Sequence, residues 1–384
     1  MVADLSQYAG REQAWVKHYF LEGYFETLAH KAASKYPEIA YVDGFSGPWQ
    51  SSGEDFRDTS FGVALDALRK AKAAWKFRRE VRMSAHLVEK NRDAYARLEA
   101  IKPRYPDIDI HTYHGDFITK VHQLRTAIPN DAFAFLFIDP KGWAIDMKAL
   151  TPLLARLNTE VVFNFMFDFI NRAAAMQSNP TLIETLDRLI PYGDWQRRLP
   201  SIKTPEDRRH VLVDAFRQTL ATLGDYRFVA DIPILRPLRD RTLYCLVYGT
   251  RHPTGIEVFR DWHVKTERAQ SRSRSQTKRA QEEAATGQTR LFGDDVQLAP
   301  DDIEQFLAAE RQAARTVLLS LTPPEPQSAS YGSLWPHVLA AHAVTHPDVN
   351  AIAAELRKEG KLLFPDWGSR DRVPKDDYRI SRTR

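Results

Sequence analysis

The 384-residue chain contains one cysteine, Cys245, and no long uninterrupted apolar run. A single thiol excludes an intramolecular disulfide and a cysteine-rich zinc site. No stretch approaches the roughly 20 apolar residues that a membrane span needs. The first residues also lack the basic and apolar regions of a secretory signal. We therefore expect a cytoplasmic protein with no membrane partner.

The composition is that of a folded protein with more than one domain. Apolar residues make up 43% of the sequence and aromatic residues 11%, which is enough to build real cores. The length favours two or three domains. A formal net charge of only +4 permits a nucleic-acid partner without demanding one, so the positions of the basic residues matter more than their sum.

Five apolar segments alternate with helical patterns in the first half of the chain. Their predicted strands cover residues 40–42, 83–88, 108–113, 132–138 and 160–167. The fourth is almost wholly apolar, as expected of a strand that is buried on both faces. Alternation of this kind predicts an α/β fold with a doubly wound, mostly parallel sheet of Rossmann-like type. Residues 226–235 and 242–250 read as an antiparallel hairpin that closes the sheet.

Three further regions complete the predicted organisation. A helical insertion covers residues 169–223 of a first domain that spans residues 1–266. A polar, basic linker covers residues 267–300, where apolar residues are few. The pattern of helix, helix and a short apolar strand in residues 301–384 is the outline of a helical, winged-helix-like domain.

Three acids follow the predicted strands, each at or just beyond a strand end: Asp43, Glu89 and Asp116. In an open α/β sheet the ligand crevice lies at the carboxyl ends of the strands, and an acid after the second strand can accept hydrogen bonds from ribose hydroxyls. An aspartate after the third strand can meet the exocyclic amine of an adenine. Each acid taken singly also fits a helix N-cap or a surface loop. Taken together and in order, they favour a nucleoside-binding site.

The loop after the first strand limits which cofactor can bind. It has the sequence Asp43-Gly44-Phe45-Ser46-Gly47-Pro48, in which glycines allow a ligand to approach the backbone closely. The loop lacks Gly-Lys-Ser/Thr, so it does not fit a P-loop, and the lack of a complete Gly-x-Gly-x-x-Gly argues against a dinucleotide motif. A cofactor without phosphates fits better, and S-adenosylmethionine (SAM) is the common one. The predicted cofactor-binding residues are Asp43, Gly44, Phe45, Gly47, Glu89, Asp116 and Phe117.

These motifs, together with Asp139-Pro140-Lys141-Gly142-Trp143, resemble those of Rossmann-type methyltransferases. The combination is most similar to the bacterial three-Cys-motif partner proteins, with further shared features at residues 251–255 and at Gly360-Lys361. One departure is Ser46, where such loops usually carry alanine. The resemblance covers most of the chain and implies a SAM-dependent methyltransferase-type domain, a winged-helix-like C-terminal part and a three-Cys-motif partner protein of iron–sulfur type.

The stretch of residues 139–143 lies where amino-methyltransferases carry Asp/Asn-Pro-Pro-aromatic. Methylation of an exocyclic amine needs hydrogen-bond acceptors near the nitrogen and an aromatic face that holds the base. We assign these catalytic roles to Asp139, Pro140 and Trp143. The alternative is an ordinary strand end, at which Asp139 caps the next turn and Trp143 packs.

Residues that could contact a substrate lie in two places. Lys141, Asn164 and Asp168 are predicted at the same edge of the sheet, and Arg272, Arg274 and Lys278 lie in the basic linker. A basic run is usually a solvent-exposed surface. The more specific alternative is that these residues contact the phosphates of a nucleic acid. No metal site is predicted, because His342 and His346 are four residues apart but have no cysteine nearby and no glutamate between them.

The sequence thus favours a SAM-dependent methyltransferase that acts on nucleic acid, with the exocyclic amine of a base as the leading acceptor. Two alternatives stay open. One is a methyltransferase-like binding module that serves a partner protein, and the other is a methyltransferase for a small molecule.

Overall fold

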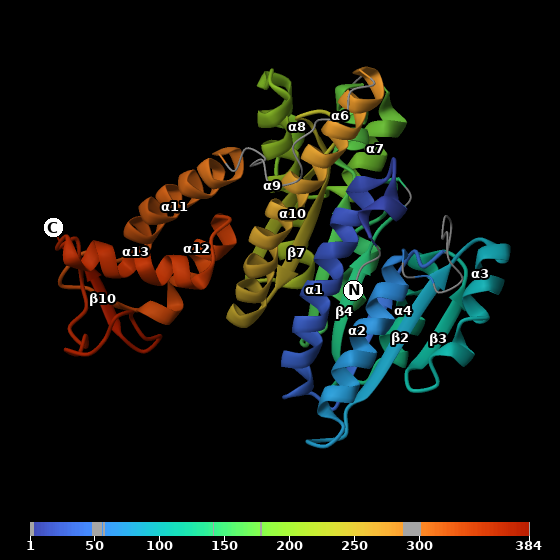
Figure 1. The fold of residues 1–384 in the computed structure, drawn as a ribbon, viewed down its shortest axis with the longest axis horizontal. Coiled ribbons are helices and arrows are strands. Elements are labelled where there is room, and N and C mark those ends of the chain that lie inside the picture. Colours follow the sequence, from blue (N-terminus) through green and yellow to red (C-terminus); the bar gives the residue numbers. More distant parts are fainter. Residues whose placement is uncertain are drawn as a thin grey trace. The chain divides into compact units, whose positions relative to one another are not determined.

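The computed structural model describes residues 4–47, 56, 58–140, 142–176, 179–286 and 301–383. Contacts divide the chain into two compact units, Met1–Arg251 and His252–Arg384. The first unit contains the sheet and the second the C-terminal helices (Figure 1). The predicted boundary at residue 266 lies inside a helix, α10 (Pro253–Thr286), of the second unit.

A seven-stranded sheet with the order β3-β2-β1-β4-β5-β7-β6 forms the centre of the first unit. Neighbouring strands among β1–β5 pair in parallel, whereas β7 runs antiparallel to both β5 and β6. The predicted doubly wound α/β sheet and its closing hairpin are therefore confirmed. The strands are β1 (Glu38–Asp43), β2 (Arg82–Glu89), β3 (Asp109–His114), β4 (Phe133–Ile138), β5 (Thr159–Phe165), β6 (Phe228–Leu235) and β7 (Thr242–Thr250).

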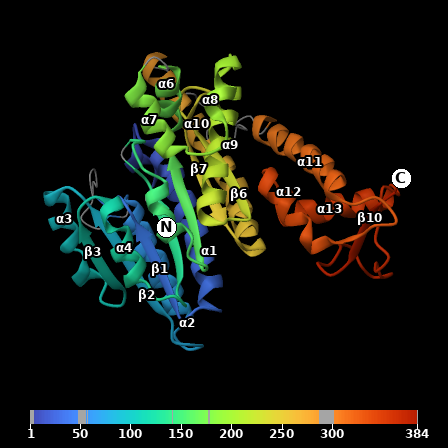
Figure 2. The same ribbon diagram turned by 180° about the vertical axis from the view of Figure 1, so that it is seen from behind.

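Helices cover both faces of this sheet, and Figure 2 shows the ribbon from behind. On one face α1 and α2 pack against each other, and the Phe25 ring of α1 lies 5.3 Å from that of Tyr41 and 4.9 Å from that of Phe135. On the other face, side chains of β1, β4 and β5 share one core with α4, α5 and α9. The helices are α1 (Glu12–Ala33), α2 (Ser60–Trp75), α3 (Arg92–Glu99), α4 (Phe117–Ala127), α5 (Thr151–Leu154), α6 (Phe167–Ala175), α7 (Pro180–Leu189), α8 (Trp195–Arg198) and α9 (Pro205–Gly224).

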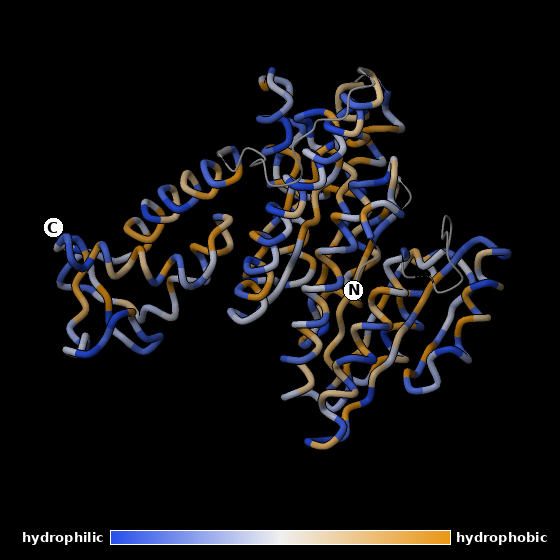
Figure 3. Tube along the Cα trace, viewed as in Figure 1, coloured by the Kyte–Doolittle hydropathy of each residue, from blue (hydrophilic) through white to orange (hydrophobic). Residues whose placement is uncertain are grey.

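Local sequence explains several of these boundaries. Every residue of β4 is buried, which suits its uninterrupted apolar sequence, and the central strands appear as apolar segments in Figure 3. Thr59 caps the start of α2, because its Oγ1 accepts a hydrogen bond from the backbone N–H of Gly62 at 3.2 Å. The predicted helical insertion corresponds to α6–α9.

The second unit combines helices with a small antiparallel sheet of order β8-β10-β9. The winged-helix assignment stays a prediction. The elements besides α10 are α11 (Asp301–Leu321), β8 (Ala329–Ser330), α12 (Trp335–Ala341), α13 (His346–Lys358), β9 (Leu362–Leu363) and β10 (Arg379–Arg382).

The predicted linker over residues 267–300 is wrong as far as residue 286, because α10 continues to Thr286. This segment is rich in Arg, Ala, Gln and Glu, which are good helix formers, although most of them are polar. Ala269, Gln270 and Ser273 are also buried. Residues 287–300 lie outside the described part of the chain.

In the part of the chain that the structure describes, no helix combines the length and the apolar character that crossing a membrane requires.

Candidate functional site

Two adjacent cavities lie at the carboxyl ends of the parallel strands. Both use the loops that follow β1 and β4, and they share Phe45, Pro140 and Gly142 as lining residues. This is the edge at which ligands bind in open α/β sheets. Most of the predicted site residues therefore converge here, although they come from the ends of five different strands.

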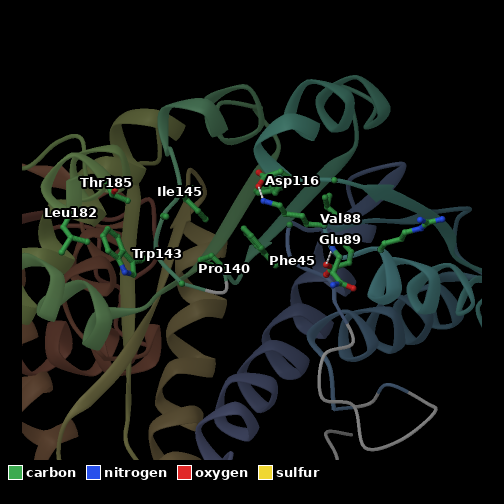
Figure 4. Close-up of a pocket in the computed structure, with 17 residues that line it drawn as sticks. Phe45, Val88, Glu89, Asp116, Pro140, Trp143, Ile145, Leu182 and Thr185 are labelled. Carbon is green, nitrogen blue, oxygen red and sulfur yellow. Dashed lines mark hydrogen bonds and ion pairs between the residues drawn. The ribbon is translucent and has the colours of Figure 1, made fainter. Parts of the chain in front are cut away.

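The first cavity has a volume of about 950 Å³, within the range of small-molecule sites. Figure 4 shows Trp143, Leu182 and Thr185 on one side and Glu89 and Asp116 on the other, with Phe45 and Pro140 between them. Of the residues predicted to bind cofactor, this cavity is lined by Gly44, Phe45, Glu89, Asp116 and Phe117.

Glu89 is held at the end of β2 with its side chain buried. Its Oε1 atom accepts a hydrogen bond from the backbone N–H of Asn91 at 2.5 Å, which fixes the orientation of the carboxylate. The neighbouring strand end is tied to the same place, because the backbone N–H of Gly115 donates to the Glu89 carbonyl at 3.0 Å. Gly115 has a φ of +138°, a conformation that favours glycine. A buried carboxylate is thus presented to the cavity in a defined position.

Asp116 begins α4 and caps it. Its Oδ1 atom accepts a hydrogen bond from the backbone N–H of Ile118 at 3.1 Å, and its Oδ2 atom lies 3.2 Å from Lys90 Nζ. The sequence allowed a cap or a ligand contact as alternatives, and the structure places a capping carboxylate in the wall of the cavity. Its side chain is 46% exposed, so it remains accessible to a bound molecule.

The loop after β1 approaches α4 so closely that only glycine fits at its start. A Cβ atom on Gly44 would lie 2.7 Å from Cδ1 of Phe117, inside van der Waals contact. The Phe117 ring in turn meets the Phe45 ring edge to face at 5.7 Å. These contacts make a smooth apolar floor between Glu89 and the loop after β4.

Trp143 does not lie where the sequence placed it. It lines the first cavity beside Leu182 and Thr185 of α7, whereas Asp139 lines the second. Lys141, between them, lies outside the described residues. The structure therefore does not place Asp139 and Trp143 around the same base, as the sequence predicted. Trp143 instead lines the same cavity as Glu89, on the opposite side of it (Figure 4).

The second cavity has a volume of about 450 Å³, and most of the residues that line it have polar side chains. It lies between α1, the start of α2 and the ends of β1, β4 and β5. Its polar lining residues are Arg11, Gln13, Lys17, His18, Asp43, Ser46, Asp58, Thr59, Ser60, Asp139, Asn164 and Tyr244, and Gly47 also lines it.

Lys17, Asp139 and Asn164 form a hydrogen-bonded network in this cavity. Asp139 forms an ion pair with Lys17 Nζ through Oδ2 and accepts a hydrogen bond from Asn164 Nδ2 through Oδ1. Asn164 is buried, and among the described residues its Oδ1 atom has no hydrogen-bond donor. A buried acceptor without a donor is expensive to maintain, so this atom is suited to accept from a bound molecule.

Lys17 was not identified from the sequence, although a signal was present. The positions of Lys17, Leu21, Tyr24 and Leu28 repeat at helical spacing, and the last three are fully or almost fully buried. A cation at the end of such an apolar stripe needs a buried partner. Since α1 precedes β1, its first turns lie at the edge of the sheet where the strand ends carry their acids, and Asp139 is that partner.

Asp43 is buried at the floor of the second cavity, with an exposed fraction of 1%. Its carboxylate accepts hydrogen bonds from the backbone N–H of Phe45 at 2.9 Å and from the Tyr41 hydroxyl at 3.1 Å. Burial nevertheless raises the pKa of Asp43 to about 7, and the nearby charge of Asp139 adds to this effect. A bound cation would favour the ionised form of Asp43.

This raised pKa makes a prediction about stability. The folded protein holds a proton on Asp43 that the unfolded chain releases near pH 4, so the contribution of Asp43 becomes less favourable as pH rises from about 4 to about 7. At ~1.4 kcal/mol per pKa unit the ionised form costs on the order of 4 kcal/mol. We expect Asp43→Asn to gain stability relative to wild type between pH 5 and pH 8, measured by urea unfolding. A stability difference that is the same at both pH values would contradict this.

The remaining predicted substrate residues do not line either cavity. Asp168, on α6, is buried and forms ion pairs with Arg236 and Arg241, so it cannot contact a substrate directly. Arg272, Arg274 and Lys278 lie on α10 in the second unit. Helical geometry puts Arg274 and Lys278 on one face of α10 and Arg272 on nearly the opposite one, so the three cannot converge on one ligand through α10 alone.

No group of three or more His, Cys, Asp or Glu side chains within the described residues is arranged to hold a metal ion.

Comparison of the sequence with models of known families and with curated proteins finds no match. The resemblance to the three-Cys-motif partner proteins stays a prediction.

Solved structures with a similar arrangement include several methyltransferases. The O-methyltransferase TomG from Streptomyces achromogenes, in complex with SAM, is 12% identical over 60% of this chain and 79% of its own, with a TM-score of 0.33. A loganic acid methyltransferase with SAH is 8% identical over 73% of this chain and 90% of its own, with a TM-score of 0.33. PKMT2 from Rickettsia typhi is 7% identical over 62% and 56%, with a TM-score of 0.28. These likenesses are weak.

Proposed function

We propose that this protein is a SAM-dependent methyltransferase whose acceptor is the exocyclic amine of a base in a nucleic acid. The observation that carries the proposal is the first cavity. It joins the buried carboxylate of Glu89, the side-chain-free surface of Gly44 and the accessible carboxylate of Asp116 at the carboxyl edge of a Rossmann-like sheet.

The residues of this cavity fit the adenosine part of SAM. Glu89 would accept hydrogen bonds from the ribose hydroxyls, and Asp116 would accept one from the adenine amine. The apolar faces of Phe45, Ile145 and Trp143 would enclose the base.

The second cavity fits the reacting end and the acceptor. When bound, SAM supplies a methyl group on a positively charged sulfur. Asp43 and Asp139 place carboxylates in the cavity where this sulfur would lie. Asp43 is next to Gly44, at the boundary between the two cavities. Negative charge here favours a cationic ligand.

The network of Lys17, Asp139 and Asn164 would hold the acceptor. An exocyclic amine donates two N–H groups, and the network offers two kinds of acceptor, Asn164 Oδ1 and the Asp139 carboxylate to which Asn164 Nδ2 donates. Alignment of the nitrogen with the methyl carbon supplies most of the rate in such a transfer. The nitrogen–carbon bond forms as the sulfur–carbon bond breaks, and the nitrogen then loses a proton, for which Asp139 is the nearest carboxylate acceptor of the network.

Calorimetric titration with SAM and with its demethylated product tests the cofactor assignment. We expect micromolar binding of both molecules in a 1:1 complex. Incubation with tritium-labelled SAM and single-stranded DNA or RNA oligonucleotides of mixed sequence should then transfer label to a base. Absence of binding would contradict the proposal and favour a binding module that serves a partner protein. Binding without transfer to either nucleic acid would point to a different acceptor.

A further inference from the structure

A cluster of arginines lies at the same edge of the sheet, outside both cavities. Asp168 in the first turn of α6 is buried, with an exposed fraction of 2%. Its Oδ1 atom lies 2.6 Å from Nη2 of Arg241, and its Oδ2 atom lies 2.6 Å from Nη2 of Arg236. Nη2 of Arg172 lies 3.5 Å from the same Oδ2 atom. One buried carboxylate therefore anchors three guanidinium groups.

These arginines remain accessible although their carboxylate is buried. The side chains of Arg236, Arg241 and Arg172 are 38%, 46% and 55% exposed, compared with 3% for that of Asp168. The turn between β6 and β7 adds exposed Arg239 and Asp240, so four arginines accompany two carboxylates. The cluster has an excess of positive charge, and its anchoring limits the conformational entropy that binding an anion would cost.

An exposed aromatic ring lies within this cluster. Phe169 on α6 is 46% exposed, and the guanidinium carbon of Arg172 lies 4.7 Å from the centre of its ring. A flat apolar face next to fixed cations is the combination that binds stacked bases and their phosphates in single strands.

The position of the cluster connects it to the second cavity. Asp168 follows Met166 by two residues, and Arg241 precedes Leu243 by two residues, and both Met166 and Leu243 line that cavity. Residues directly before α6 and at the start of β7 therefore form part of the cavity wall, close in sequence to Asp168 and Arg241.

We infer that Phe169, Arg172, Arg239 and Arg241 form a platform for a single-stranded segment of nucleic acid. One base stacks on Phe169, the adjacent phosphates contact the arginines, and a neighbouring base enters the second cavity. This inference rests on the proposed function and deepens it, since it assigns substrate docking to the first unit rather than to Arg272, Arg274 and Lys278. Asp168 acts as a positioning residue that holds the arginines in place.

The test is fluorescence anisotropy with a labelled single-stranded DNA 12-mer of mixed sequence, over a range of salt concentrations. Arg172→Gln combined with Arg239→Gln leaves the two short ion pairs of Asp168 intact, so the fold is preserved. We expect at least tenfold weaker binding, and a salt dependence whose slope falls by about 1.4, because each phosphate contact to a single strand contributes about 0.7. Phe169→Ala should weaken binding about tenfold without changing the slope.

Arg78→Gln combined with Arg97→Gln is the matched control, since it removes the same charge from exposed positions after α2 and on α3. SAM binding should be unchanged in all variants. Equal losses in the control, or tighter binding of the duplex than of the single strand, would overturn the inference. A protein that binds SAM but no single strand would refute the platform alone. One that binds the single strand through the platform but not SAM would refute the proposed methyltransferase instead.

Discussion

Glu89→Ala is expected to abolish measurable SAM binding while the protein stays folded. The carboxylate is the only buried acid among the described residues that line the first cavity, and it would accept charge-assisted hydrogen bonds from two ribose hydroxyls. Each such bond contributes roughly 1.5–3 kcal/mol, so losing both weakens binding by at least about 100-fold. Glu89→Gln should retain part of the affinity, because its amide oxygen can still accept from Asn91. Calorimetric titration measures both variants.

Glu80→Ala provides the control for this experiment. Glu80 is exposed and lies just before the opposite end of β2, so its loss removes the same charge far from the cavity. Its affinity for SAM should equal that of the wild type. Unchanged affinity in Glu89→Ala, with circular dichroism showing a folded protein, would remove the nucleoside site from the first cavity.

The sheet could be predicted from the sequence because its signals are local. An apolar run such as residues 133–138 can be satisfied only where both faces are covered, and alternation with helices then implies parallel pairing. The hairpin of β6 and β7 was also predicted from a local signal, two extended segments separated by a short turn. Since the carboxyl ends of parallel strands share one edge, Asp43, Glu89 and Asp116 could be placed together without knowing any tertiary contact.

Contacts between distant segments could not be predicted in this way. Lys17 and Asp139 are 122 residues apart, and only the packing of α1 onto the sheet brings them together. The division of residues 139–143 between two cavities depends on how α7 packs beside Trp143. A polar composition also could not distinguish a linker from the exposed length of α10, because helix propensity and solvation act in the same residues.

Asp168 shows how a correct location can carry a wrong role. Its position after β5 placed it correctly at the carboxyl edge of the sheet. The sequence could not show that the turn between β6 and β7 brings three arginines to this edge, of which two form ion pairs with Asp168. Asp168 therefore holds the arginines in place, and it is the arginine side chains that are accessible to a ligand.

Asp139→Asn is expected to bind SAM with wild-type affinity and to lose about 10²–10⁴-fold in the rate of methyl transfer. The variant keeps an oxygen that can accept the hydrogen bond from Asn164, so the shape of the second cavity is preserved. It loses the negative charge that pairs with Lys17 and that would accept the proton from the methylated nitrogen. Single-turnover transfer of tritium from SAM to a mixed-sequence single-stranded oligonucleotide separates the chemical step from cofactor binding.

The ion pair between Lys17 and Asp139 allows a second variant to distinguish two explanations for the slow rate. Lys17→Met combined with Asp139→Asn removes both charges of the pair. If Asp139 acts mainly by receiving the proton and orienting the amine, the double variant should be no faster than Asp139→Asn alone. If the single variant were slow only because it leaves the half-buried ammonium of Lys17 without its partner, the double variant would recover most of the rate. Asp131→Asn, exposed before the opposite end of β4, removes the same charge without touching the cavity and should react at the wild-type rate. Recovery in the double variant would make Asp139 a structural partner of Lys17 and would move the chemistry to another acceptor in the second cavity.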